Sequence, residues 1–314
     1  MSTPAIEANG LTKTYRGLNA VYDLKLSVPT GSVYGFLGRN GAGKTTTIKM
    51  LLGLARPTAG SARVLGLDIV RDNLAILQRT AFVGEHKVLY EKLTPAELVR
   101  FTKGFYQQWD DDAVTRCARK MEIPMNRRFA KLSKGTRAKV WLLLALAQRA
   151  DLLILDEPTS GLDPVVKDDF LRLLVEEHAS EGRTVFFSSH DLSEIEQVAD
   201  RVGILSGGSL LLDAALEDVR ANFRLIIAAG TNLPRERAQN VASLRADGQF
   251  VRYLLSRDAA PFAAALESQG AAVTANTAVS LREVFLELVR KEEELCISGN
   301  AGVTPAAHSL ASLA

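Results

Sequence analysis

The chain has 314 residues, of which 47% are hydrophobic and 24% charged, as expected of a globular protein with a sizeable core. Its 38 basic and 36 acidic residues leave a net charge of +2, which argues against nucleic acid or acidic lipid as an electrostatic partner. Residues 1–9 carry no secretory signal, and no segment reaches the ~20 apolar residues that span a bilayer. Cys117 and Cys296 fit no metal or redox spacing and suggest a reducing compartment. We therefore expect a cytoplasmic protein that needs a partner for any work at a membrane.

A complete phosphate-binding motif occupies residues 38–45, Gly-Arg-Asn-Gly-Ala-Gly-Lys-Thr, which fits G-x-x-x-x-G-K-[ST]. An apolar, β-prone run at 32–37 precedes it, and a helix-compatible run at 46–52 follows it. The glycines let backbone N–H groups converge on phosphate oxygens, and the start of the helix adds partial positive charge. We expect Lys44 to reach the β- and γ-phosphates and the Thr45 hydroxyl to bind Mg²⁺. The alternative, a glycine-rich turn with a chance lysine, does not explain the match or its flanks.

A second motif ends in two adjacent carboxylates. The apolar run 152–155 leads into Asp156 and Glu157, and a loop with prolines and a glycine follows at 158–164. This pattern predicts a buried strand that delivers acid to a polar site. Because side chains alternate along a strand, the two carboxylates should point in different directions. One can then hold a metal ion while the other handles a proton. The alternative is that two acids follow this strand by chance and have no catalytic role. The phosphate motif upstream disfavours that alternative.

Together these motifs closely resemble the ATP-binding cassette (ABC) ATPases. Residues 40–46, Asn-Gly-Ala-Gly-Lys-Thr-Thr, and 155–159, Leu-Asp-Glu-Pro-Thr, read almost letter for letter like that family. Three further elements appear in the family's order. The signature loop, LSGGQ in the family, is similar to residues 132–136, Leu-Ser-Lys-Gly-Thr. The D-loop resembles residues 160–163, and the segment of the switch histidine resembles residues 188–191, Ser-Ser-His-Asp. The resemblance covers about residues 5–215, and this ordered set is specific to the family.

The resemblance implies a Mg²⁺-dependent ATPase and a role for each matching residue. ATP would be bound by Tyr15, Gly38, Asn40, Gly41, Ala42, Gly43, Lys44, Thr45, Thr46, Glu85, Ser133, Gly135 and Asp163, and Mg²⁺ by Thr45, Asp156 and Glu85. Tyr15 would stack on adenine, its alternative being a surface aromatic in an early hairpin. Glu157 would be the general base. His190, at the end of the strand-like run 184–189, would contact the γ-phosphate and orient the water, although a lone histidine there is more often structural.

The chain departs from the family's pattern at three positions. Lys134 replaces the first glycine of the signature loop and Thr136 its glutamine, while the serine and second glycine are kept. Lys134 either adds charge near the phosphates or points into solvent. Glu85 takes the place of the Q-loop glutamine; the rival, Gln78, lies before the strand rather than after it. Glutamate can still bind Mg²⁺ or water but adds charge and loses a donor, which affects the expected efficiency of hydrolysis rather than ATP binding.

In the family, the signature loop meets the nucleotide of a second subunit. Ser133 would offer a hydroxyl and Gly135 a backbone N–H to that γ-phosphate. The helix predicted over 137–150 would aim its N-terminus at the same phosphate. One phosphate motif and one signature loop per chain imply a head-to-tail homodimer, held together by ATP and released by hydrolysis.

The expected fold is α/β: a P-loop ABC-type nucleotide-binding domain with a mixed sheet core, a helical subdomain and an N-terminal antiparallel β part, followed by a small α+β module. We place the cassette at 5–217 with its helical subdomain at about 86–135, the module at 218–295, and a disordered tail at 296–314. Pro95 after Thr94 marks a helix start in the subdomain. In the module, 223–228, 250–255 and 271–273 predict strands, and 259–269 and 281–294 predict helices.

The segment 280–288 is similar to the ending of ABC-2 type exporter ATPases, and Glu85 and the threonine run 45–47 agree with it. We therefore expect the ATPase subunit of an exporter, docked through 85–93 on a separate integral membrane permease at the inner face of the plasma membrane. The alternative is a soluble ABC ATPase that acts on ribosomes or nucleic acid, which the single cassette and low charge disfavour. A GTPase switch would need an N-K-x-D motif, which the sequence lacks.

Overall fold

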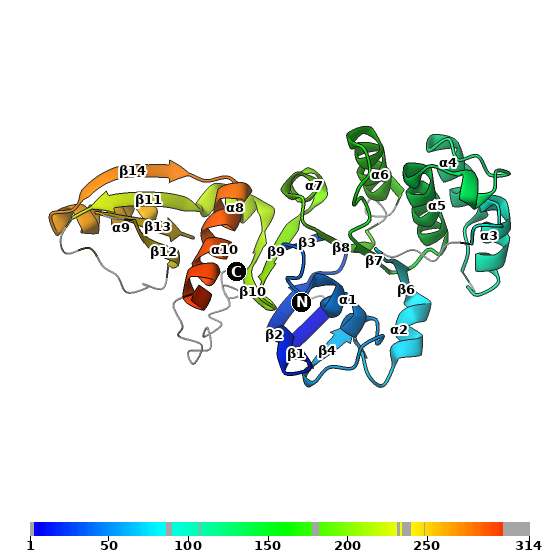
Figure 1. The fold of residues 1–314 in the computed structure, drawn as a ribbon, viewed down its shortest axis with the longest axis horizontal. Coiled ribbons are helices and arrows are strands. Elements are labelled where there is room, and N and C mark those ends of the chain that lie inside the picture. Colours follow the sequence, from blue (N-terminus) through cyan, green and yellow to red (C-terminus); the bar gives the residue numbers. More distant parts are fainter. Residues whose placement is uncertain are drawn as a thin grey trace.

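The computed structural model of the chain describes residues 3–85, 90–106, 108–177, 182–230, 233, 240–247 and 249–297. Figure 1 shows an elongated molecule with three parts in a row. A group of helices lies at one end, a core of sheets lies in the middle, and a further sheet with helices lies at the other end.

The centre of the core is a six-stranded sheet in the order β10-β9-β3-β8-β7-β6. Its strands are β3 (Val33–Leu37), β6 (Thr80–Val83), β7 (Leu152–Asp156), β8 (Thr184–Ser189), β9 (Arg201–Ser206) and β10 (Ser209–Ala215). All neighbours pair in parallel except β10, which forms an antiparallel hairpin with β9. The strands predicted before the phosphate motif, before the acid pair and before the switch histidine are confirmed. Because they are parallel, the carboxyl ends of β3, β8 and β7 lie side by side.

Side chains alternate across this sheet into two hydrophobic cores. On one face, Tyr34, Phe36 and Phe186 pack with the N-terminal sheet and helix α1 (Lys44–Leu51). On the other face, Leu37 and Phe187 join a larger cluster that includes the helices α5 (Lys134–Ala147), α6 (Pro164–Glu177) and α7 (Leu192–Val198). Burial on both faces explains why the strands read as continuous apolar runs.

The N-terminal part is the antiparallel sheet that the sequence predicts. Its order is β2-β1-β4-β5, with β1 (Ile6–Tyr15), β2 (Leu18–Val28), β4 (Ala59–Val64) and β5 (Leu67–Asp68). In Figure 1 this sheet lies below the central sheet, and α1 fills the space between them. Helix α2 (Asn73–Arg79) then leads into β6.

The helical end comprises α3 (Pro95–Lys103), α4 (Asp111–Lys120), a 3-10 turn (Phe129–Lys131) and α5. Helix α3 begins where predicted, because Thr94 caps it and forms a capping box with Glu97, and Pro95 takes the first helical position. The helix predicted over 137–150 is displaced: α5 begins at Lys134 and ends at Ala147. The reason is a cap, since the Ser133 side chain accepts a hydrogen bond from the N–H of Thr136. Residues 134–136 therefore form the first helical turn rather than a loop.

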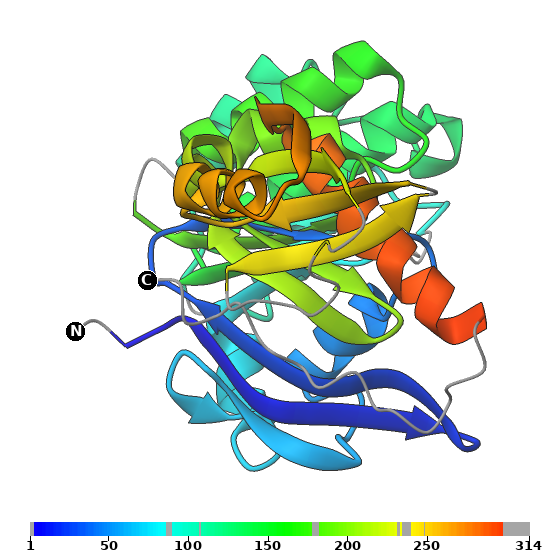
Figure 2. The same cartoon turned by 90° about the vertical axis from the view of Figure 1, so that its left-hand side faces the viewer.

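The C-terminal module is an antiparallel sheet in the order β12-β13-β11-β14 with two helices. Its elements are β11 (Arg224–Ala229), β12 (Val241–Asp247), β13 (Phe250–Leu255), α9 (Ala259–Ser268), β14 (Ala272–Ala278) and α10 (Leu281–Ile297). Figures 1 and 2 show α10 between this sheet and the core, where it packs against β12 on one side and against α7 and β9 on the other. Strand β12 was not predicted, and β14 is longer than the predicted strand at 271–273.

The junction between core and module is itself a helix, α8 (Leu216–Asn222). The expected boundary at residue 217 falls inside it, and Val219 and Phe223 pack in the same hydrophobic cluster as Leu212 of β10. Helix α10 extends to Ile297, so the expected tail at 296–314 begins within a helix. Residues 298–314 lie outside the described residues.

Candidate nucleotide-binding site

The three motifs that point to ATP chemistry meet at the carboxyl edge of the central sheet. The phosphate-binding loop follows β3, the acid pair ends β7, and His190 follows β8, which lies between the other two strands. A backbone hydrogen bond joins two of these segments, because the N–H of Gly38 donates to the carbonyl of Ser189 at 3.2 Å. The sheet order thus brings together residues that are more than a hundred positions apart.

The phosphate-binding loop turns sharply at Gly43 before α1 begins. Gly43 has φ = 109°, and a Cβ there would collide with the carbonyl oxygen of Ala20, so only glycine fits. The Lys44 side chain is 5% exposed, and three acceptors surround its Nζ: Gly38 O at 2.6 Å, Arg39 O at 3.2 Å and Glu157 Oε1 at 2.9 Å. The two carbonyl oxygens accept hydrogen bonds from the ammonium, and the Glu157 carboxylate forms an ion pair with it. The N–H groups of the first turn of α1 have no acceptor within the helix and face the same loop.

The two adjacent carboxylates contact different partners, although the cause is not strand alternation, because β7 ends at Asp156 and Glu157 lies outside it. Asp156 Oδ1 accepts a hydrogen bond from Ser188 Oγ at 2.7 Å, and Ser188 Oγ accepts one from the N–H of Glu157 at 3.1 Å. Glu157 has φ = 48°, a left-handed conformation that costs a non-glycine residue free energy. This backbone turn directs the Glu157 side chain to Lys44 and His190. Strain of this kind clusters at functional sites.

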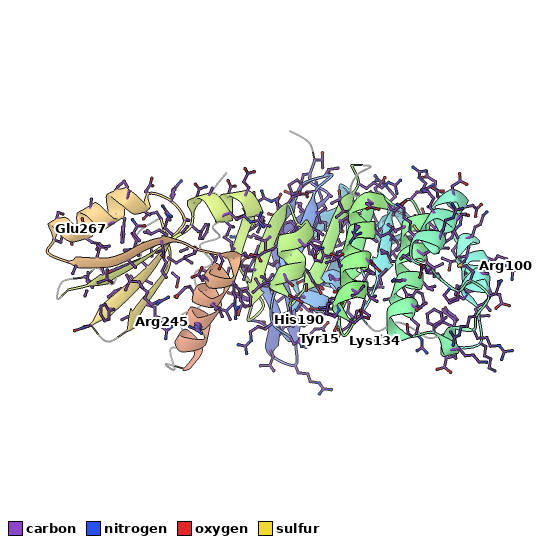
Figure 3. All side chains as sticks on the ribbon, turned by 90° about the horizontal axis from the view of Figure 1, so that it is seen from above. Tyr15, Arg100, Lys134, His190, Arg245 and Glu267 are labelled. Carbon is purple, nitrogen blue, oxygen red and sulfur yellow. The ribbon has the colours of Figure 1, made fainter. Side chains whose placement is uncertain are left out.

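His190 completes a row of three polar side chains. Its Nδ1 lies 2.7 Å from Glu157 Oε2, while Lys44 Nζ lies 2.9 Å from Glu157 Oε1. Glu157 is 8% exposed, whereas the side chain of His190 is 47% exposed, so the imidazole borders solvent (Figure 3). A cation, a buried carboxylate and an accessible imidazole therefore stand beside a loop built to receive phosphate. That arrangement suits phosphoryl transfer to water.

Comparisons with known proteins agree with this geometry. A family model described as ABC transporter matches residues 21–160. The bacitracin transport ATP-binding protein BcrA of Bacillus licheniformis is 37% identical over 227 residues, which are 71% of this chain and 74% of BcrA. The chain belongs to the ABC transporter ATP-binding proteins. The daunorubicin/doxorubicin resistance ATP-binding protein DrrA of Streptomyces peucetius is 35% identical over 250 residues, 77% of this chain and 72% of DrrA.

The fold comparison gives the same family. A solved structure titled as the ATP binding subunit of an ABC transporter superposes with a TM-score of 0.61 at 30% identity, covering 69% of this chain and 92% of that one. This chain is thus an ABC ATPase. Among its described residues, none of the helices combines the length and the apolar character needed to cross a bilayer.

The remaining predicted site residues of the ATPase lie around this centre. Tyr15 ends β1 with 47% of its side chain exposed, and Lys13 Nζ lies 4.9 Å from its ring centroid. Glu85 is exposed two residues beyond β6, the neighbour of β7, and no hydrogen bond or ion pair connects it to another described residue. Asp163 caps α6, accepting from the N–H of Val166 at 3.0 Å. Nucleotide contacts by Tyr15, Glu85 and Asp163 stay predictions.

The signature segment lies at the start of α5, apart from the chain's own phosphate-binding loop. Ser133 is exposed and caps the helix, and Gly135 packs near Val166 of α6. The ammonium of Lys134 lies against Gly161 of the D-loop, where a Cβ would collide with it. Tyr15, Lys134 and His190 lie on the same side of the molecule in Figure 3. The roles of Ser133 and Gly135 toward a second nucleotide stay predictions.

The residues present fit a magnesium ion that is held partly by the nucleotide. The Thr45 hydroxyl in the first turn of α1 and the buried Asp156 carboxylate are hard oxygen donors, which Mg²⁺ prefers. Among the described residues, no three His, Cys, Asp or Glu side chains gather into a metal site. A Mg²⁺ ion that binds through one or two protein oxygens, phosphates and water needs no such group.

Sequence reasoning missed a second set of polar residues behind the site. Ser188 links Asp156 to the backbone of Glu157, and Glu194 bonds to both Thr159 and Ser189. The signal was the polar pair Ser188 and Ser189 at the end of a strand that is otherwise apolar. Both serines are fully buried, and buried hydroxyls need hydrogen-bond partners.

Proposed function

We propose that this ABC ATPase binds Mg²⁺–ATP and energises export of a substrate through a separate ABC-2 type membrane permease, with two copies closing head to tail around ATP. The observation that carries the proposal is the row Lys44–Glu157–His190 beside the phosphate-binding loop. The relatives BcrA and DrrA, named for bacitracin transport and for drug resistance, support the direction of export.

The row supports a mechanism in which ATP binding frees the general base. Gly38 O, Arg39 O and the Glu157 carboxylate surround the Lys44 ammonium, so an arriving phosphate oxygen competes with them for it. Replacing Glu157 Oε1 transfers the lysine's charge to the phosphates and releases the carboxylate to accept a proton from water. Bound Mg²⁺, held by Thr45 and Asp156, would neutralise phosphate charge. His190, already oriented by Glu157, would face the γ-phosphate from the solvent side.

The start of α5 supports the dimeric part of the proposal. Ser133 at its N-terminus is exposed and Gly135 is half-buried, so the start of the helix, with its partial positive charge, lies at the surface, which suits an anion brought by another molecule. In this arrangement Ser133 and Gly135 of one chain would contact the γ-phosphate bound to Lys44 of the other.

An aromatic cluster on the helical end supports a membrane partner. Tyr90, Phe101 and Phe105 are 40%, 50% and 71% exposed, and their rings touch in sequence, with centroids 5.9 Å and 5.2 Å apart. Exposed aromatic clusters mark protein–protein contacts, since large apolar side chains gain most when a partner removes them from water. The cluster includes Tyr90, which belongs to the segment 85–93 where a permease is expected to dock.

Purification from native membranes tests the proposal. The full chain, extracted in mild detergent, should bring down an integral membrane protein, and Phe101→Ser with Phe105→Ser should lose it. Leu74→Ser is the matched control, because Leu74 is 73% exposed on α2, away from the aromatic cluster. Co-purification with ribosomes and no membrane protein would instead favour the soluble ABC ATPase.

A further inference from the structure

Glu194 is a buried charged residue outside the phosphate-binding loop, the acid pair, the signature segment and the segment of the switch histidine. It lies near the start of α7 and is 4% exposed. Its Oε1 accepts a hydrogen bond from Thr159 Oγ1 at 2.8 Å and pairs with Lys167 Nζ at 2.9 Å, and its Oε2 accepts from Ser189 Oγ at 2.7 Å. A carboxylate with both oxygens bonded to separate segments connects those segments rigidly.

The segments joined by Glu194 carry the reacting groups. Thr159 lies two residues after Glu157, and Ser189 lies one residue before His190. The backbone of Ser189 also accepts from the N–H of Gly38, the first residue of the phosphate-binding loop. Glu194 therefore holds, from behind, both segments that carry the 2.7 Å contact between Glu157 and His190.

The third partner extends the same network beyond the D-loop. Lys167 in α6 pairs with Glu194 and, at 3.0 Å, with Asp191, the cap of α7. Burial alone would lower the pKa of Lys167, but its hydrogen bonds to Glu194 and Asp191 raise it above its ordinary value. The lysine stays charged, so Glu194 has a permanent counter-ion. A buried carboxylate without such partners would be costly, so these three partners account for its place in the core.

We propose that Glu194 is a positioning residue for ATP hydrolysis: it fixes Glu157 and His190 relative to each other and to the phosphate-binding loop, and so sets turnover rather than ATP affinity. The proposal rests on the roles proposed above for Glu157 and His190. It predicts a specific kinetic pattern, because small displacements of reacting groups slow chemistry strongly, whereas the loop that binds ATP keeps its own contacts.

The test compares Glu194→Gln with Glu196→Gln in the full chain. Both lie on α7, but Glu196 is exposed. Glu194→Gln keeps the shape and removes the charge that holds Lys167. We expect kcat to fall about 10- to 100-fold with ATP affinity within about twofold of wild type, and Glu196→Gln to match wild type. Wild-type kcat in Glu194→Gln, or an equal loss of kcat and ATP-binding stoichiometry, would overturn the proposal.

Removing each of the two hydroxyl partners of Glu194 gives a second test, whose single variants do not require Glu194→Gln to fold. Thr159→Val and Ser189→Ala each delete one hydroxyl, and each should lower kcat without changing ATP affinity. In the Glu194→Gln background they should add little, since residues that act through one network are not additive. Additive losses of kcat in the double variants would show that Thr159 and Ser189 do not act through Glu194. If instead Glu157→Gln hydrolyses ATP like wild type, the proposed base is wrong, a failure that is separate from this one.

Discussion

The ammonium nitrogen of Lys44 lies 2.9 Å from Oε1 of Glu157, and both side chains are buried. The cation of the phosphate-binding loop is thus neutralised by the carboxylate expected to act as the base. An arriving phosphate competes for the same ammonium. When phosphate replaces Glu157 as the partner of Lys44, the nucleotide is bound and the base is released in the same step.

Glu157→Gln should separate binding from turnover. The amide keeps the shape of the side chain but cannot take a proton from water, so hydrolysis should fall at least about 100-fold. ATP affinity should be equal to that of wild type or higher, because a negative charge beside the phosphates is removed. Phosphate release and equilibrium binding of a fluorescent ATP analogue measure the two quantities. Normal turnover would remove Glu157 from the role of base.

Lys44→Ala should lose nucleotide affinity. Charge-assisted hydrogen bonds to phosphate contribute about 1.5–3 kcal/mol, which corresponds to roughly 10- to 150-fold in Kd. The substitution also leaves Glu157 without its counter-ion in a buried position. Lys49→Ala is the control, because Lys49 lies on the same helix with its side chain exposed. Titration of both variants with Mg²⁺–ATP measures the two Kd values. An unchanged Kd in Lys44→Ala would contradict the assignment of residues 38–45 as the phosphate-binding loop.

Ser133→Arg should block ATP-driven dimerisation. A bulky side chain at the start of α5 would occupy the place of the partner's γ-phosphate in the proposed dimer. Loss of the cap alone costs about 1 kcal/mol, so Ser133→Ala serves as the control for local helix stability. Light scattering in the Glu157→Gln background, with and without ATP, should show a monomer for the arginine variant and a dimer for Ser133→Ala, weakened only by the loss of one hydroxyl contact. A dimer in both would argue against the composite site.

The sequence predicts the site well where the chemistry is local. The phosphate-binding loop, the acid pair and His190 each follow a strand that reads clearly as apolar, and parallel pairing then places them together. Glu194 escapes such reasoning, because a glutamate in the short polar helix α7 looks like part of a solvated face. Only the pairing of β7 with β8, which sets Asp156 opposite Ser188, brings that helix behind the acid pair.

The missed elements have equally specific causes. The sequence pattern predicts the start of α5 three residues late, because residues 133–136 resemble a loop, although Ser133 is a good helix cap. Strand β12, Val-Ala-Ser-Leu-Arg-Ala-Asp, carries few β-branched residues and is defined by its pairing with β13. Local propensity gives little warning of such a strand, since its stability comes from its neighbours.

A carboxylate at the end of α6 makes the attachment of the helical end sensitive to acid. Glu177 pairs with Lys120 at 2.7 Å and with Arg116 at 3.3 Å, both in α4. Burial raises the pKa of Glu177, but the hydrogen bonds and charges of Lys120 and Arg116 outweigh it and lower the pKa below its ordinary value. A group whose pKa is lower in the folded chain contributes stability above its unfolded pKa and loses it as the pH falls through its folded pKa.

Glu177→Gln should therefore lower the free energy of unfolding by about 1 kcal/mol at pH 7, a value that allows for the exposure of both cations. The difference from wild type should shrink as the pH falls below 4.5, the ordinary value for glutamate. Urea unfolding followed by the fluorescence of Trp109 and Trp141, which both belong to the helical end, measures this. The free energy of unfolding of Glu196→Gln should equal that of wild type both at pH 7 and below pH 4.5. A difference for Glu177→Gln that stays constant from pH 7 into the acid range would show that its ion pairs with α4 do not stabilise the fold.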